Sequence, residues 1–227
     1  MKKYKYLLFD LDGTLTDPFE GITKSVQYAL NAFGIMDEPL EKLKKFIGPP
    51  LKASFMDFYG FDSEKAETAV LKYRERFADT GIFENKVYDG VEQMLKVLKD
   101  SGYVLAIASS KPTVFVERIL EHFHLRDYFD NVTGSFLDGR RTKKSEVIEA
   151  VIEALKIADR KEALMIGDRF HDVEGAKEAG IDCVGAAFGY GGREELENAG
   201  AIEVLGSVEE LKKLLLCRNT PAHNRTV

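Results

Sequence analysis

Four short apolar runs along the chain predict the strands of a sheet. They lie at residues 6–9, 104–108 and 163–166, with a weaker run at 183–186. Each has the length of a strand, and none alternates strictly between apolar and polar positions. Strands that are covered on both faces have this continuous apolar character. The pattern therefore predicts a parallel sheet with helices on both faces.

The longer segments between these runs carry apolar residues at helical spacing. The apolar stripes are Val91, Leu95 and Leu98; Val114, Ile119 and Phe123; and Val147, Val151 and Leu155. Such stripes are typical of helices that bury one face against a sheet. Strands that alternate with helices predict an α/β fold.

The segment 17–86 breaks this alternation, because it contains no strand pattern. Its spacing is helical and it is rich in aromatic residues, which we interpret as a helical core rather than a platform for stacking a ligand. An insertion of roughly 70 residues is long enough for a small unit of its own. We predict an all-helical cap domain at 17–86, inserted after the first strand of a core formed by residues 1–16 and 87–216. Gly48-Pro49-Pro50 predicts a sharp turn within it.

The polar residues 217–227 lack periodicity and predict a flexible tail. No apolar stretch approaches the roughly 18 residues of a membrane helix. The apolar run near the start ends at Asp10, too early for a signal peptide. The two cysteines, Cys183 and Cys217, are far apart and argue against a disulfide framework or a structural zinc site. We therefore expect a cytoplasmic protein that does not bind membranes.

Composition narrows the range of partners. The chain has 227 residues, of which 44% are hydrophobic and 31% charged, as in ordinary globular proteins. Its 32 basic and 38 acidic side chains give a net charge of −6. A mildly acidic surface argues against binding to nucleic-acid polymers, which requires basic patches. It allows a small phosphorylated ligand, which needs only a local positive site.

Polar residues follow three of the predicted strands. The first run leads into Asp10-Leu11-Asp12-Gly13-Thr14, the second into Ser109-Ser110-Lys111, and the third into Asp168, with Asp172 four residues later. Ligands of an open parallel sheet bind beyond the carboxyl ends of its strands. We therefore expect the three polar clusters to meet at one edge of the sheet.

The residue types in these clusters indicate phosphoryl chemistry. Asp10 and Asp168 bring two carboxylates together, and like charges in a partly buried place need a neutralising group. Mg²⁺ held by carboxylates and phosphate oxygens is a common solution. Lys144 supplies a further positive charge and Ser109 a hydroxyl donor. A metal, a lysine and a hydroxyl together suit a dianionic phosphoryl group.

The residue types assign no metal-binding role to the Asp12 side chain, so a different role has to be considered for it. A carboxyl group two residues from a carboxylate nucleophile suits general acid and base catalysis. It would protonate the leaving alcohol and then activate water against an aspartyl-phosphate. Gly13 permits the tight backbone path of such a loop.

These clusters resemble the four motifs of the haloacid dehalogenase-like hydrolase superfamily. Asp10-Leu11-Asp12-Gly13-Thr14 resembles the first motif, Ser109 the second, Lys144 the third, and Gly167-Asp168-Arg169-Phe170-His171-Asp172 the fourth. The resemblance covers residues 5 to about 215 and is greatest to phosphoglycolate phosphatase-like and bacterial 5′-nucleotidase-like members. It implies a five-stranded Rossmann-like core under a helical cap that closes over the substrate and sets specificity.

The resemblance also implies a role for each residue. Asp10 would be the nucleophile and Asp12 the general acid and base. Mg²⁺ would be held by the Asp10 and Asp168 carboxylates and the Asp12 main-chain carbonyl, with Asp172 nearby or linked through water. The phosphate would be bound by Ser109, the backbone amide of Ser110, and Lys144. Lys143 is an alternative to Lys144, which we favour because its Lys-x-acidic-Val-Ile run fits one type of relative.

We therefore predict a Mg²⁺-dependent phosphatase of a small phosphomonoester, either phosphoglycolate-like or a nucleoside 5′-monophosphate. Pyrophosphate and sugar phosphates also stay open. A phosphomutase or a phosphonatase on the same scaffold is the alternative. Asp12 argues against a dehalogenase, and the intact motifs argue against a non-catalytic binding protein. A monomer and a homodimer are both compatible with the sequence.

Overall fold

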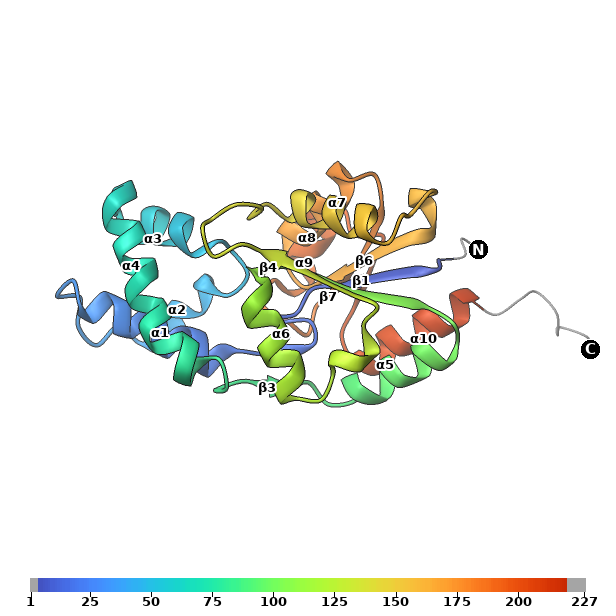
Figure 1. Ribbon diagram of the computed structural model, residues 1–227, viewed down its shortest axis with the longest axis horizontal. Helices are drawn as coiled ribbons and strands as arrows, with labels where there is room; N and C mark the ends of the chain where they lie inside the picture. The colour runs from blue at the N-terminus through green and yellow to red at the C-terminus, as the bar shows by residue number, and fades with distance from the viewer. Residues whose placement is uncertain (1–3, 220–227) are drawn as a thin grey trace, which may run out of the picture.

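The first apolar run, Tyr6–Phe9, forms strand β1 inside a six-stranded parallel sheet (Figure 1). The computed structural model describes residues 4–219 and orders the strands β5-β4-β1-β6-β7-β8. The other three runs are β4 (Val104–Pro112), β6 (Ala163–Gly167) and β7 (Asp182–Ala186). The predicted α/β fold with a parallel sheet is confirmed.

The two edge strands were not predicted. They are β5 (Asn131–Ser135) and β8 (Glu203–Leu205). The five-stranded core implied by the resemblance is therefore wrong by one strand. An edge strand pairs on one side only and is covered less completely, so it needs no continuous apolar run. All three residues of β8 are only half-buried.

Helices cover both faces of the sheet, as predicted (Figure 1). Successive residues of a strand point to opposite faces. Leu7 and Phe9 pack in one apolar cluster, and Leu8 packs in the other. The first cluster lies under α5 (Val91–Asp100), α6 (Thr113–His122) and α10 (Val208–Asn219). The second lies under α7 (Lys144–Ala154), α8 (Phe170–Glu178) and α9 (Gly192–Ala199).

The predicted helical stripes are buried or half-buried except at one position, and Phe123 and Leu155 lie one residue past the ends of their helices. Val91, Leu95 and Leu98 are fully buried on α5. On α6, Val114 is 47% exposed although Ile119 is buried. Five residues along a helix turn the side chain by about 140° from its starting direction, so these two cannot share one face.

Helices occupy the inserted segment, which lies to the left in Figure 1. They are α1 (Phe19–Asn31), α2 (Leu40–Leu43), a 3₁₀ turn (Lys44–Phe46), α3 (Leu51–Tyr59), α4 (Ser63–Arg76) and a π-helical turn (Phe77–Gly81). A short antiparallel pair, β2 (Thr16–Asp17) and β3 (Lys86–Val87), joins the two ends of the segment. The turn predicted at 48–50 lies between the 3₁₀ turn and α3, with a positive φ of 102° at Gly48.

Many of the aromatic residues of this inserted segment, called the cap segment below, lie in its interior. Phe46, Phe55 and Phe61 are buried, and the rings of Phe46 and Phe55 lie 5.0 Å apart between centroids. Tyr73 and Phe77 stack at 5.0 Å. The packing agrees with the interpretation of these rings as a helical core.

The predicted tail is wrong at its first three residues, because α10 continues through residue 219. Buried Leu211 and Leu215 anchor this helix to the core, which explains why the polar residues that follow still continue the helix. Residues 220–227 lie outside the described part of the chain. Over residues 4–219, no helix combines the length and the apolar character needed to cross a bilayer.

Candidate active site

Three buried aspartates meet beyond the carboxyl ends of β1 and β6. Asp10 follows β1, Asp168 follows β6, and Asp172 lies in the first turn of α8. One carboxylate oxygen from each residue lies within 4.8 Å of the others. These strands are neighbours in the sheet, and the Asp10 amide donates to the Ile166 carbonyl at 2.9 Å. The sheet therefore places both aspartates that the sequence singled out at the same edge.

Lys144 lies in this cluster, and Lys143 does not. The Lys144 ammonium is 3.0 Å from Asp10 Oδ1 and 2.7 Å from Asp172 Oδ1, and it donates to the Ala108 carbonyl at 3.0 Å. Its side chain is 4% exposed. Lys143 precedes α7 and is exposed. The buried position of Lys144 supports it as the lysine that faces the phosphate.

Asp12 lies beside these aspartates but pairs with a different lysine. The Lys111 ammonium is 2.7 Å from Asp12 Oδ2 and 2.8 Å from Oδ1, and both side chains are largely buried. Burial raises the pKa of Asp12, and the Lys111 charge opposes that shift. The Lys111 ammonium also lies 4.9 Å from the ring centroid of Phe77 in the cap segment. Lys111 therefore connects the predicted acid/base residue to the cap.

The serines Ser109 and Ser110 lie within β4, because this strand extends four residues beyond the predicted run. Its pairing with β5 shifts register between Ala108 and Pro112. Ser109 is buried, and its hydroxyl accepts a hydrogen bond from the Lys111 amide at 3.4 Å. Ser110 is half-buried, and its carbonyl accepts from the Ser135 hydroxyl at 2.7 Å. The irregular end of the strand brings both serines to the edge where Asp12 lies.

Asp168 is held by groups from two loops. The Thr14 hydroxyl donates to Asp168 Oδ1 at 3.3 Å, and the Tyr190 amide donates to Oδ2 at 2.8 Å. Gly13 has a φ of 81°, and a Cβ atom there would lie 2.1 Å from Asp168 Oδ2. Any larger residue at position 13 would therefore displace the carboxylate.

Replacing Gly13 by alanine is expected to disturb the aspartate cluster more than the backbone strain alone explains. Gly102→Ala is the matched control, because Gly102 has a φ of 83° and no atom within 4 Å of the added Cβ. An alanine in this left-handed conformation costs about 1–2 kcal/mol at either position. We expect only Gly13→Ala to lower the catalytic activity of the site, by about tenfold or more, because a small misplacement of a site group has an effect of that size. Equal activity of the two variants would contradict the packing argument.

The burial and the negative charges of the cluster favour the binding of a cation. Burial raises the pKa of Asp168 well above its ordinary value, and the neighbouring Asp172 and Asp10 add to the shift. Burial also raises the pKa of Asp172 to about 6, although Lys144 opposes it. Burial disfavours the charged form of Lys144, but Asp10 and Asp172 outweigh that effect and raise its pKa. Burial first, and then repulsion between the carboxylates, therefore disfavours their charged forms.

Mg²⁺ fits this set of donors. The three carboxylates and the single ammonium leave two negative charges without a counterpart. The oxygens are hard ligands and lie close enough to share one small divalent ion. Asp10, Asp168 and Asp172 are thus the side chains that would hold it.

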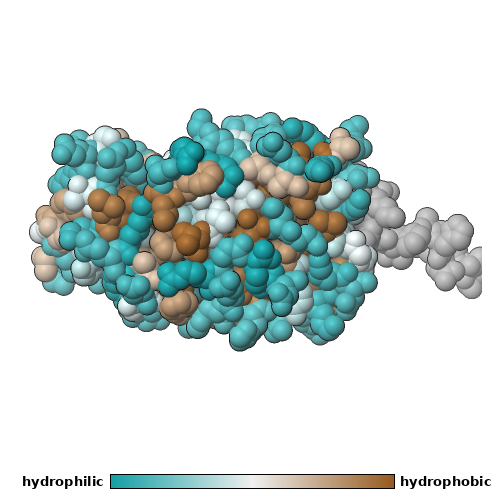
Figure 2. Space-filling model, in the orientation of Figure 1, coloured by the Kyte–Doolittle hydropathy of each residue, from teal (hydrophilic) through white to brown (hydrophobic). Residues whose placement is uncertain are grey.

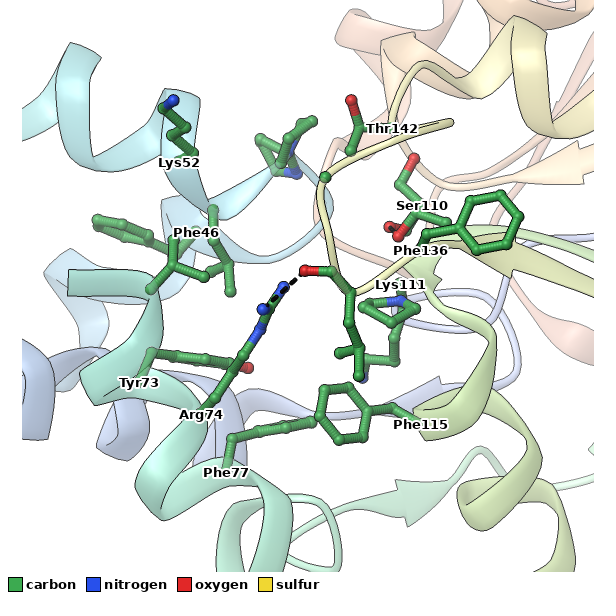
Figure 3. Close-up of a pocket in the computed structure, with 18 of the residues that line it drawn as sticks. Phe46, Lys52, Tyr73, Arg74, Phe77, Ser110, Lys111, Phe115, Phe136 and Thr142 are labelled. Carbon is green, nitrogen blue, oxygen red and sulfur yellow. Dashed lines mark hydrogen bonds between the residues drawn. The ribbon is translucent and has the colours of Figure 1, made fainter. Parts of the chain in front are cut away.

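A cavity of about 500 Å³ opens from Asp12 between the cap segment and the core. Cap residues Phe46, Tyr73, Arg74 and Phe77 face Lys111, Phe115 and Phe136 of the core across it, as Figure 3 shows. Hydrophobic residues gather where the two parts meet on the face shown in Figure 2. Leu71, Phe136 and Leu137 are exposed at the rim. The cavity offers an apolar place for a leaving group next to the charged cluster.

Sequence reasoning missed several residues of this site. Lys111, Tyr190 and Arg74 received no role, although Lys111 stands directly after the two serines. Tyr190 lies in a glycine-rich loop after β7, and that loop was a usable signal of close backbone approach. A Cβ at Gly189 would lie 2.3 Å from the Gly13 carbonyl. Arg74 had no such signal, because nothing in its neighbourhood separates it from a solvated helix residue.

Comparisons with known proteins agree with this geometry. A family model described as haloacid dehalogenase-like hydrolase matches residues 7–186. A 5′-nucleotidase of Pseudomonas aeruginosa is 48% identical over 194 residues, covering 86% of this chain and 87% of the relative. Phosphoglycolate phosphatase 1 of the same organism is 31% identical over 228 residues, covering 96% and 81%. A crystal structure of a predicted phosphatase from Clostridium acetobutylicum superposes with a TM-score of 0.92 at 54% identity, covering 94% and 99%.

Proposed function

The chain belongs to the haloacid dehalogenase-like hydrolases, and from this membership we propose that it is a Mg²⁺-dependent phosphatase of nucleoside 5′-monophosphates or phosphoglycolate-like esters. The observation that carries the proposal is the buried cluster of Asp10, Asp168, Asp172 and Lys144 beside Asp12. This cluster combines a carboxylate nucleophile, a place for a cation and a fixed ammonium. All three are needed for attack on a dianionic phosphoryl group.

Asp10 acts first. Its carboxylate oxygen attacks phosphorus, and the bond from phosphorus to the ester oxygen breaks. Asp12 donates its proton to the departing oxygen, which leaves as an alcohol. Lys144, held 3.0 Å from Asp10, balances the negative charge of the phosphoryl oxygens. The product of this half-reaction is an aspartyl-phosphate on Asp10.

Asp12 acts again in the second half-reaction. As a carboxylate it takes a proton from water, and the resulting hydroxide oxygen attacks the phosphorus of the aspartyl-phosphate. The bond from phosphorus to Asp10 breaks, which releases phosphate and regenerates both aspartates. Lys111 holds the Asp12 carboxylate in place through this cycle. A bound Mg²⁺ supplies charge neutralisation for the phosphate and the three aspartates.

The size and lining of the cavity support a nucleotide. A phosphoglycolate ion would fill only a small part of 500 Å³. The lining residues Leu71, Phe136 and Leu137 are apolar and exposed, and a carboxylate gains little from such surfaces. A nucleobase gains burial of its flat apolar faces there. Similarity to a 5′-nucleotidase at 48% identity points in the same direction.

Three further parts of the proposal were first inferred from the sequence: the location of the protein, its oligomeric state and the role of residues 17–86. The chain works in the cytoplasm, as either a monomer or a homodimer, and residues 17–86 act as a cap domain over the core. The cap closes over bound substrate and sets specificity. The β2–β3 pair at the base of the cap is the natural hinge, since both chain crossings pass through it.

Release of phosphate from a panel of compounds tests the proposal. The panel contains nucleoside 5′-monophosphates, phosphoglycolate, pyrophosphate and sugar phosphates, each with Mg²⁺ and with EDTA. We expect turnover that requires Mg²⁺ and is greatest on nucleoside monophosphates. A folded protein that releases no phosphate from any compound would contradict the phosphatase proposal.

Replacing Asp168 by asparagine is expected to raise the Mg²⁺ concentration needed for half-maximal activity at least about tenfold, as changes at metal sites commonly do. Asp168 forms no ion pair with Lys144, so the variant leaves the phosphate lysine in place. A Mg²⁺ titration of phosphate release measures the effect. Asp127→Asn, at an exposed aspartate, is the control. An unchanged titration for Asp168→Asn would remove this residue from the metal site.

A further inference from the structure

We propose that Arg74 makes the cavity select nucleotides whose base carries a keto oxygen over those that carry an amino group at the same ring position. The inference rests on the proposed nucleotidase function and deepens it. It concerns the part of the cavity beyond Asp12, where the leaving group lies. Arg74 stands on α4 and extends into this space, as Figure 3 shows.

Most N–H donors of the Arg74 guanidinium have no hydrogen-bond partner among the described residues. Among the residues that the structure describes, its one hydrogen bond is from Nη1 to the Leu137 carbonyl, at 2.8 Å. A guanidinium carries five N–H donors and no acceptor. The Arg74 side chain is half-buried in the cavity wall. Its remaining donors are therefore available to a bound ligand rather than to the protein.

Arg74 also differs from the other charged residues that line the cavity, because it has no ionic partner within residues 4–219. The other charged side chains that line the cavity are all paired: Lys111 with Asp12, Lys52 with Glu67, and Asp138 with Arg140. The Asp12 carboxylate is bound by Lys111 at both oxygens, whereas the Glu67 and Asp138 carboxylates are more than half exposed and pair with Lys52 and Arg140. The hydroxyls of Ser110, Ser135 and Thr142 both donate and accept, so they do not discriminate. Arg74 is therefore the half-buried charged group of the lining whose donors are left for a ligand.

The surroundings of Arg74 suit the edge of a flat base. Tyr73 precedes it on α4, and Phe46 and Phe115 face the same space. A base held in the space between these residues presents its edge to the guanidinium. A keto oxygen accepts from it, whereas an amino group sets donor against donor and leaves both without a partner. Hypoxanthine adds the neighbouring N7 acceptor and permits the two-pronged contact that arginine makes with such edges.

Two pairs of substrates isolate this feature. Inosine and adenosine 5′-monophosphates differ at position 6 of the purine by a keto oxygen against an amino group. Uridine and cytidine 5′-monophosphates differ in the same way at position 4 of the pyrimidine. We expect kcat/KM to favour the keto member of each pair by roughly 10- to 100-fold, the range for one well-placed edge contact.

Variants at position 74 connect the preference to the residue. In Arg74→Met and Arg74→Gln we expect both ratios to fall to within about threefold of one, because methionine offers no donor and glutamine both donates and accepts. Loss of the Leu137 contact would lower hydrolysis of both members of a pair alike, so the ratio is insensitive to a structural effect. Lys72→Met is the control, since Lys72 is on the same helix, pairs with Glu75 and does not line the cavity. It should keep both ratios.

The outcomes separate the inference from the proposed function. Hydrolysis of all four nucleotides at similar kcat/KM, or ratios unchanged by both Arg74 variants, overturns the inference and leaves the nucleotidase proposal intact. Hydrolysis of p-nitrophenyl phosphate or phosphoglycolate without hydrolysis of any nucleotide overturns the inference and the nucleotidase part of the proposed function, and it leaves the phosphatase part intact. A loss confined to phosphoglycolate in the Arg74 variants assigns the guanidinium to a substrate carboxylate and also overturns the inference. Keto preference that disappears in both variants supports it.

Discussion

Asp10→Asn is expected to lower kcat for every phosphomonoester by roughly 10⁴-fold or more, the scale on which loss of a nucleophile acts. The asparagine amide is too weak a nucleophile to attack phosphorus, so no aspartyl-phosphate forms. Its shape matches that of the carboxylate, and the backbone bond from residue 10 to the Ile166 carbonyl is unaffected. We therefore expect a folded protein that binds substrate without turning it over.

Phosphate release and trapping of a phosphoenzyme measure this prediction together. Asp100→Asn is the control, because Asp100 ends α5 and its side chain is 68% exposed in a surface pair with Lys96. The control should keep the wild-type rate. An Asp10→Asn protein that hydrolyses a generic phosphomonoester at the wild-type rate would refute the nucleophile and with it the proposed mechanism.

Lys144→Met is expected to cause the second-largest loss, in both activity and stability. Its ammonium lies within 3.0 Å of two buried carboxylates. Removing one partner from a buried ionic cluster leaves uncompensated charge, which costs about 3–5 kcal/mol. We expect that loss in the free energy of unfolding of the metal-free protein and a smaller loss with saturating Mg²⁺, since the cation replaces part of the missing charge. The rate should fall by roughly 10²- to 10³-fold, as for loss of one group that stabilises the transition state.

Lys143→Met is the matched control for this variant. The two lysines are adjacent in sequence, but Lys143 is exposed and Lys144 is buried. Urea unfolding with EDTA and with Mg²⁺ measures the stability, and phosphate release measures the rate. We expect Lys143→Met to lie close to the wild type in both. A larger loss from Lys143→Met than from Lys144→Met would reassign the phosphate lysine.

The sequence alone predicted the parts of the molecule that depend on local pattern. Continuous apolar runs identified β1, β4, β6 and β7, because strands buried on both faces have no polar positions. The polar residues that follow them pointed to one edge of the sheet, since parallel strands share their carboxyl ends. Asp10, Asp12 and Asp168 were found in this way. The edge strands β5 and β8 and the end of α10 were not, because short or polar segments become ordered through packing against elements that are distant in sequence.

Only the tertiary structure decided which side chains work together. The sequence favoured Lys144 but left Lys143 as an alternative, and the fold buries only Lys144 against Asp10 and Asp172. It could not pair Asp12 with Lys111, because 99 residues separate them and their contact arises where β4 passes β1. Arg74 was indistinguishable from a solvated helix residue until the fold placed it in the wall of the cavity. A residue's type limits its chemistry, but its burial and its partners, which determine its charge and its task, come from contacts across the whole chain.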